Sequence, residues 1–251
     1  MKMIKKYFVL FSIIFLFIMC NNEDANICLQ TSGTIIKKEI LIPSVEKIIV
    51  NNQIELFITA DPAYKIRIEA DENLIEGIDI TISENQLEIT NHNTCFFYKD
   101  YTAKVTVYAP NLIQIRNSSA LAVQSIGTLN YPKLTLISEN YLSNYLNSGE
   151  FNLEINNDEL NLLANGASNH KINGFTNQLN INLVGGNPRF DGQNLSAQNA
   201  YLFARSSNDI LIKVTNEVLG NLYNTGDVLL YKKPNIMSLE AHYTGEIINK
   251  Y

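Results

Sequence analysis

Residues 164–169 read Ala-Asn-Gly-Ala-Ser-Asn, and similar turn-like segments recur through the C-terminal half of the chain. The others are Val-Gly-Gly-Asn-Pro-Arg at Val184, Ala-Arg-Ser-Ser-Asn-Asp at Ala204, Tyr-Asn-Thr-Gly-Asp at Tyr223 and Tyr-Thr-Gly-Glu at Tyr243. Their starts lie 20, 20, 19 and 20 residues apart, and a period in this range is typical of stacked supersecondary units. The repeat therefore predicts the architecture of this part of the chain. It does not identify a ligand, because only backbone geometry and apolar spacing recur.

Each repeat combines a short apolar strand, the polar turn, and a second short apolar segment such as residues 210–214 or 228–231. Such a unit cannot bury its own apolar face, so it must stack on its neighbours with strands about 4.8 Å apart. Residues 111–251 are therefore expected to form a β-solenoid like a single-stranded β-helix. Its coils should be right-handed, as parallel crossovers are. The alternative, an antiparallel sandwich with hairpins every eight to twelve residues, would not keep one turn motif at fixed spacing.

Residues 35–110 show a period of two, which predicts an N-terminal lobe of short strands with one buried face. Only residues 71–77 look helical, and Gly77 should end that turn. The 34 Asn residues gather between the apolar runs, as suits a fold with many tight corners. No linker separates the two parts, so residues 35–251 are expected to form one continuous domain.

The N-terminus has the pattern of a secretory signal over residues 1–19, with Lys2, Lys5 and Lys6 before a short apolar run. Cys20 resembles the acceptor cysteine of a bacterial lipoprotein, although Met19 stands where a small residue is usual. Residues 20–34 would then be a lipidated tether. An uncleaved N-terminal membrane anchor is the alternative.

Loss of residues 1–19 would change the formal net charge from −6 to −9, because it removes three lysines and no acid. An acidic surface argues against a nucleic-acid partner. Two cysteines remain, Cys28 and Cys95, and an even number in an exported chain predicts a disulfide between them. A metal site or a catalytic thiol is the alternative, but no His or Asp stands near either cysteine at a known ligand spacing.

No catalytic motif or cofactor-binding motif is present, and the three histidines stand far apart. One acidic column is predicted from equivalent places in successive repeats, namely Asp209, Asp227 and Glu246. Stacked like charges favour either capping of turn amides or a bound cation such as calcium, and capping is the better interpretation.

A set of aromatic residues recurs near the turns and could line one face: Tyr201, Phe203, Tyr223, Tyr231 and Tyr243. Exposed, such a ladder would stack on sugar rings or anchor a protein partner, whereas buried it would be ordinary core.

Short motifs occur in both halves of the chain. The N-terminal half contains Gln53-Ile-Glu-Leu, Asp71-Glu-Asn-Leu-Ile-Glu-Gly-Ile and Glu84-Asn-Gln-Leu-Glu-Ile, and the C-terminal half contains Asn224-Thr-Gly-Asp-Val and Tyr243-Thr-Gly-Glu-Ile. With these motifs the two halves together resemble the family called putative auto-transporter adhesin, head GIN domain. The family implies an all-β, solenoid-like domain outside the cytoplasm, adhesive and without established catalytic residues. Asn187-Pro188 and Ser206-Ser207 stand where the pattern has glycines, so a coil distorted near Pro188 is expected.

The sequence thus favours a lipid-anchored, non-enzymatic adhesion or binding module without a cofactor, at the outer membrane or cell surface. The periplasm-facing leaflet stays open as its location. Its partners would be the membrane, through the N-terminal lipid, and a glycan or protein ligand. The short C-terminus should leave a sheet edge uncovered, which allows a homodimer. The rival hypothesis is a polysaccharide lyase or hydrolase, for which only Arg189, Arg205 and the acidic column offer candidate groups.

Overall fold

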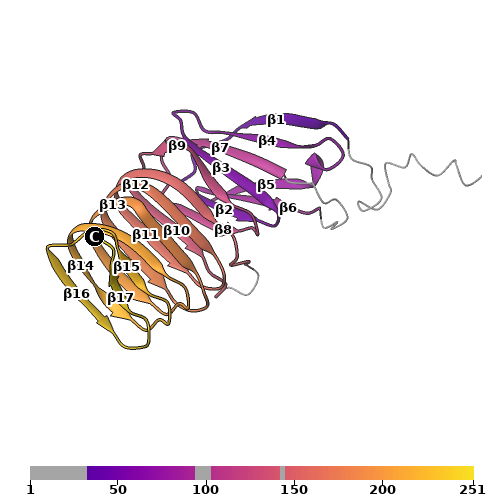
Figure 1. Cartoon of the computed structure of the whole chain (residues 1–251). Helices are drawn as coiled ribbons and strands as arrows, with labels where there is room; N and C mark the ends of the chain where they lie inside the picture. The colour runs from indigo at the N-terminus through magenta and orange to yellow at the C-terminus, as the bar shows by residue number, and fades with distance from the viewer. Residues whose placement is uncertain (1–32, 94–102, 142–144) are drawn as a thin grey trace, which may run out of the picture.

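The computed structural model describes residues 33–93, 103–141 and 145–251. Cys20, Cys28 and Cys95 lie outside these residues, so the predicted lipidation and disulfide stay predictions. The described chain is all-β, with its strands in one curled sheet and a single 3₁₀ turn at Ile75–Gly77, where a helical turn was expected (Figure 1).

The strands, in chain order, are β1 (Ile35–Leu41), β2 (Lys47–Asn51), β3 (Ile54–Ala60), β4 (Lys65–Asp71), β5 (Ile78–Ser83), β6 (Gln86–Asn91), β7 (Ala103–Ala109), β8 (Gln114–Ser118), β9 (Val123–Leu129), β10 (Lys133–Ser138), β11 (Phe151–Ala164), β12 (Asn169–Leu183), β13 (Arg189–Ala204), β14 (Ile210–Leu222), β15 (Val228–Leu230), β16 (Ile236–Ala241) and β17 (Ile247–Asn249).

One side of the curled sheet is a parallel series of strands in the order β6, β2, β8, β10, β11, β12, β13, β14, β16. A single interior column runs through all nine: Leu87, Ile48, Ile115, Leu136, Leu162, Ile181, Leu202, Gly220 and Leu239. All but the last are buried. The parallel pairing differs from the antiparallel sandwich considered from the sequence, and it continues from the repeats into β10 and β8.

The other side of the sheet is a second parallel series, in the order β7, β3, β9, β11, β12, β13, β14, β15, β17. Its interior column is Val105, Leu56, Val123, Phe151, His170, Phe190, Ile210, Val228 and Ile247. The long strands β11 to β14 belong to both series. We call one coil the second half of such a strand, the turn after it, and the first half of the next.

The strands of the repeats are longer than predicted, because β11 to β14 have 13 to 16 residues each. From the sequence, the segment after each turn and the strand before the next turn were expected to be separate. In β11, burial alternates from Phe151 to Asn157 and again from Leu160 to Ala164, with a change of phase between. The strand therefore bends there without losing its ladder, so both halves face one core.

At the end of the sheet opposite the repeats, three strands run antiparallel to their neighbours. β1 pairs with β4, β4 pairs with β7, and β5 pairs with β6. We call β1, β4 and β5 the closing strands, since they cover the free edges of the parallel stack. In Figure 1 they lie at the indigo end, while the repeat coils form the orange and yellow end.

The corner at Pro188 continues the stack instead of distorting it, contrary to the expectation. The amide of Asn187 donates to the Gly166 carbonyl at 2.7 Å, and the amide of Arg189 donates to the Ser168 carbonyl at 3.0 Å. In the following coil the Ser206 hydroxyl donates to the Pro188 carbonyl at 2.7 Å. Pro188 lacks an N–H, but hydrogen bonds on both sides of it and to its carbonyl hold the corner in place.

Candidate binding surface

The outer face of β13 and the turn after β14 carry exposed aromatic side chains of the repeat coils. Tyr201 is 44% exposed and Tyr223 is 46% exposed. Tyr201 and Phe203 point outward because their neighbours Leu202 and Ala204 fill the interior. These residues form an exposed aromatic part of the outer surface.

Backbone hydrogen bonds between successive coils align three further residues in one column beside this face. The Arg205 amide donates to the Leu183 carbonyl at 2.7 Å, the Tyr223 amide to the Ala204 carbonyl at 2.7 Å, and the His242 amide to the Leu222 carbonyl at 2.8 Å. Arg205, Tyr223 and His242 therefore follow one another from coil to coil along the edge of the stack.

Tyr223 is the centre of a ring cluster. His242 stacks on it with ring centroids 4.5 Å apart and planes inclined by 13°. Phe203 meets it at 5.9 Å and 51°. The His242 Nε2 atom lies 3.0 Å from Asn221 Oδ1, which fixes the imidazole in this orientation. We call Tyr201, Phe203, Tyr223 and His242 the aromatic face.

The structure brings together three of the five predicted aromatic residues. Tyr201, Phe203 and Tyr223 belong to the aromatic face, whereas Tyr231 follows β15 on the other side of the sheet, where its amide bonds the Ile212 carbonyl. Tyr243 is exposed in the last turn, one residue beyond the column. His242 was not predicted as part of this face, although the apolar register places it opposite Tyr223.

A hollow of about 360 Å³ opens beside Tyr223. Its lining consists of Val184, Gly185, Gly186, Arg205, Ser206, Ser207, Tyr223 and Thr225. Gly186 has φ of +78° and an added Cβ would lie 2.4 Å from the Gly166 carbonyl oxygen, so only glycine suits this position. The hollow thus joins one aromatic ring and one guanidinium over a glycine floor.

A second hollow, of about 410 Å³, lies on the opposite side of the sheet, where the β9–β11 register shifts. Its lining is Gln124, Ser125, Asn152, Leu153, Glu154, Lys171 and Asn173. It holds one cation and one carboxylate but no aromatic ring.

The predicted acidic column has the geometry of amide capping. An Asp209 carboxylate oxygen accepts the Asp227 amide at 3.0 Å, and an Asp227 carboxylate oxygen accepts the Glu246 amide at 2.9 Å. Each aspartate thus binds the backbone of the next coil. Within the described residues, no group of three His, Cys, Asp or Glu side chains lies close enough together to hold a metal ion.

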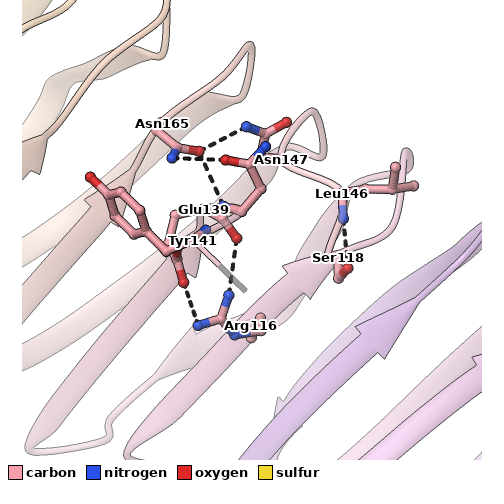
Figure 2. Close-up of polar contacts among 8 residues, drawn as sticks. Arg116, Ser118, Glu139, Tyr141, Leu146, Asn147 and Asn165 are labelled. Atoms are coloured by element: carbon pink, nitrogen blue, oxygen red, sulfur yellow. Dashed lines mark hydrogen bonds and ion pairs between the residues drawn. The ribbon is translucent and has the colours of Figure 1, made fainter. Parts of the chain in front are cut away.

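An ion pair anchors the extra chain that follows β10 at the same edge of the stack (Figure 2). Arg116 donates to a Glu139 carboxylate oxygen at 2.6 Å and to the Glu139 carbonyl at 3.1 Å. The other Glu139 carboxylate oxygen accepts the Tyr141 amide, and Asn147 donates to Asn165 of the next coil. The two charged side chains are only 11% and 5% exposed, so this network serves the fold and offers little to a ligand.

The remaining histidines show no catalytic arrangement. His170 lies in the interior column between Phe151 and Phe190, and its Nε2 atom lies 2.9 Å from the Ser168 hydroxyl. Burial lowers the pKa of His170 to about 3, because the charged imidazolium would lose its hydration. His92 lies at the surface, 3.9 Å from Asp79.

The last coil leaves part of its interior uncovered within the described chain. Met237 stands opposite buried Val218, yet it is 49% exposed. β16 and β17 each pair with a strand on one side only. The sheet edge expected from the sequence is present, while the homodimer it suggested stays a prediction.

Comparison with known proteins places these features in a family. The family described as putative auto-transporter adhesin, head GIN domain, matches residues 45–234. No curated protein matches the chain. No helix among the described residues has the length and apolar character needed to cross a bilayer.

Several solved structures share the fold. A putative adhesin from Bacteroides fragilis NCTC 9343 has a TM-score of 0.77 at 18% identity, covering 87% of this chain and 98% of that chain. A putative adhesin from Parabacteroides merdae ATCC 43184 has a TM-score of 0.60 at 16% identity, covering 87% and 97%. A putative lipid binding protein from Parabacteroides distasonis ATCC 8503 has a TM-score of 0.58 at 14% identity, covering 87% and 98%. At these identities the similarity concerns the fold alone.

Proposed function

This chain belongs to the head GIN domain family of putative auto-transporter adhesins, and we propose from that membership that it is a non-enzymatic binding module of the bacterial cell envelope. Its ligand would be a glycan or a protein presented outside the cytoplasm. Similarity to proteins described as adhesins supports the proposal.

The observation that carries the proposal is the aromatic face. Tyr201 and Tyr223 each expose nearly half of their surface on rigid strands or the turns that join them. Exposed aromatic side chains held in fixed positions are typical of binding surfaces, because they offer apolar area at a small entropic cost. A lyase or hydrolase has less support, since the aspartates of the acidic column already bind backbone amides.

The proposal includes a location and a shape. Lipidation of Cys20 after loss of residues 1–19 would attach the chain to the outer membrane, facing the cell surface or the periplasm. The parallel stack would be a right-handed β-solenoid, the hand that parallel crossovers favour. It would carry the aromatic face away from the N-terminal tether, because the face lies in the late coils.

Binding of the purified protein to a glycan array and to extracellular matrix proteins tests the proposal. We expect retention of at least one ligand, and we expect Tyr201→Ser with Tyr223→Ser to abolish that retention. Tyr251→Ser is the matched control, since Tyr251 is 53% exposed but lies outside the aromatic face. Undiminished binding by the double variant, or release of products from a polysaccharide panel, would contradict the proposal.

A further inference from the structure

We infer that the hollow between Arg205 and Tyr223 is a subsite for a carboxylated sugar, such as a uronic acid or a sialic acid. The inference rests on the proposed function, because it names the ligand class for one end of the aromatic face. Its parts are a ring for stacking, a cation for the carboxylate, and small residues that leave room for the sugar.

Tyr223 offers the ring. His242, from the following coil, stacks on one face of Tyr223, so the opposite ring face is directed toward the preceding coils, where Val184, Gly185 and Gly186 line the hollow. Phe203 meets the ring at a tilt and leaves it 46% exposed. A pyranose has apolar C–H groups on one face, and these suit an aromatic surface whose other face is already supported.

Arg205 offers the cation. Among the described residues, no hydrogen bond or ion pair engages its side chain. The cation–π contacts of the described chain belong to Lys65, Arg67 and Arg116, so Arg205 does not stack on Tyr223. A free guanidinium beside a ring favours a planar anion, because it donates two parallel hydrogen bonds to a carboxylate.

The floor offers space and hydroxyl groups. A Cβ at Gly185 would meet no atom within 4 Å, so the hollow is open above this residue. Ser207 and Thr225 lie in the lining and are exposed. The volume of about 360 Å³ is within the range of small-ligand sites.

The neighbouring carboxylates do not belong to the hollow. Its lining includes Arg205 but no Asp or Glu. Asp209 and Asp227, which are close in sequence to the lining residues, each direct a carboxylate oxygen to an amide of the next coil. The hollow on the opposite side pairs Lys171 with Glu154 and lacks an aromatic ring, so it fits a carboxylated sugar less well.

Calorimetric titration of the purified protein tests the inference with three probes: a galacturonate trisaccharide, its methyl ester, and sialyllactose. The methyl ester keeps the sugar and removes the charge. We expect the trisaccharide acid or sialyllactose to bind at least about tenfold more tightly than the methyl ester, as a charge-assisted bidentate contact implies. The ratio of the two carboxylated probes tells which source of the carboxylate the site prefers.

Variants locate the binding. Arg205→Gln should reduce the preference for the acid over the ester to less than about twofold, while Arg205→Lys keeps part of it. Arg189→Gln, in the preceding coil, and Lys171→Gln, in the other hollow, should leave the preference unchanged. Circular dichroism melting of each variant confirms that it folds.

Three outcomes would overturn the inference: no binding of either acid at millimolar concentration, equal affinity for acid and ester, or loss of preference in Lys171→Gln instead of Arg205→Gln. A different result would contradict the proposed function, namely that the double variant Tyr201→Ser with Tyr223→Ser still binds the array ligand. A protein whose array binding needs the tyrosines but not Arg205 would keep the proposed function and exclude the carboxylated sugar.

Discussion

The closing strands β1, β4 and β5 run antiparallel to their neighbours, whereas every pairing of the described chain from β10 to β17 is parallel. Two of the closing strands are largely exposed, since β1 has no buried residue and β5 has one, whereas β4 between β1 and β7 is half buried. In the repeat coils nearly every second side chain is buried between the coils before and after it. The same chemical group should therefore have different energetic weight in the two regions.

Two arginine–carboxylate pairs show this difference directly. Arg116 and Glu139 at the edge of the coils are 2.6 Å apart, and so are Arg67 and Glu39 on the closing strands. The first pair is 11% and 5% exposed, while the second is 33% and 49% exposed. Water competes for the second pair and largely not for the first, so equal geometry does not mean equal stabilisation.

Backbone crowding should give the largest contrast. Gly174 in β12 has φ of +104°, and an added Cβ would lie 2.0 Å from the Ile155 carbonyl oxygen of the preceding coil. We expect Gly174→Ala to lower the free energy of unfolding by at least about 4 kcal/mol, measured by urea denaturation. Gly127→Ala is the control, because Gly127 has φ of +75° but open space around it. Its cost should be about 1 kcal/mol, and equal losses would refute the role of coil contacts.

The two ion pairs give the next contrast. Glu139→Gln leaves the buried charge of the Arg116 guanidinium without a counter-ion, so we expect a loss of about 3 kcal/mol in the free energy of unfolding. Glu39→Gln should change the urea midpoint little, since its partner stays hydrated. Similar midpoint shifts in the two variants would show that burial does not decide the weight of these pairs.

A histidine in the core should make the coils sensitive to acid. The pKa of His170 is about 3 in the folded state and about 6.5 when unfolded, so between these values the unfolded chain binds the extra proton. Stability due to this group is therefore lost as the pH falls, by roughly 2 kcal/mol between pH 7 and pH 5.

His170→Phe, measured by urea denaturation at both pH values, should remove this part of the pH dependence. The difference between pH values decides the test, because Phe also changes the packing. A variant with the same pH dependence as the parent protein would assign the effect to other groups.

Loss of a carboxylate that caps a backbone amide of the next coil should have the smallest effect on the free energy of unfolding. Asp227→Ala removes an acceptor of the Glu246 amide and should cost about 1 kcal/mol in the free energy of unfolding. Glu246→Ala at the end of the column should cost less, because its carboxylate has no hydrogen bond in the described chain. Chelation with EDTA should leave the melting temperature unchanged. A drop on chelation would instead support the cation interpretation.

The sequence predicted the strands and the stacking of the repeats, because interior positions such as Leu162, Ile181 and Leu202 are apolar at nearly constant spacing. It placed some turns one residue out of register, since Val184 follows the residue that aligns with Ala164. A shift of one residue exchanges inside for outside. This explains why Tyr243 was predicted in the ladder and His242 was not.

Other features depend on contacts that no spacing reveals. Arg116 and Glu139 meet although 23 residues separate them, and the offset from β10 to β11 is 26 residues, because extra chain follows Glu139. His170 lies in the core, although nothing near it in the sequence shows that its column is otherwise apolar. Predicted sites at Cys20, Cys28 and Cys95 lie outside the described residues and stay predictions.

The interior column from Leu87 to Leu239 also bears on how such a protein can change in length. Because Leu162, Ile181 and Leu202 occupy one position in successive coils, a duplication or deletion of a whole coil would join residues that already fit each other. Duplication or deletion of half a coil would instead place residues from the two sides of the sheet in the same row. Whole-coil changes would shift the aromatic face by about 4.8 Å per coil relative to the closing strands. Evolution can thus change the distance between the aromatic face and the closing strands in steps of one coil, without a new core.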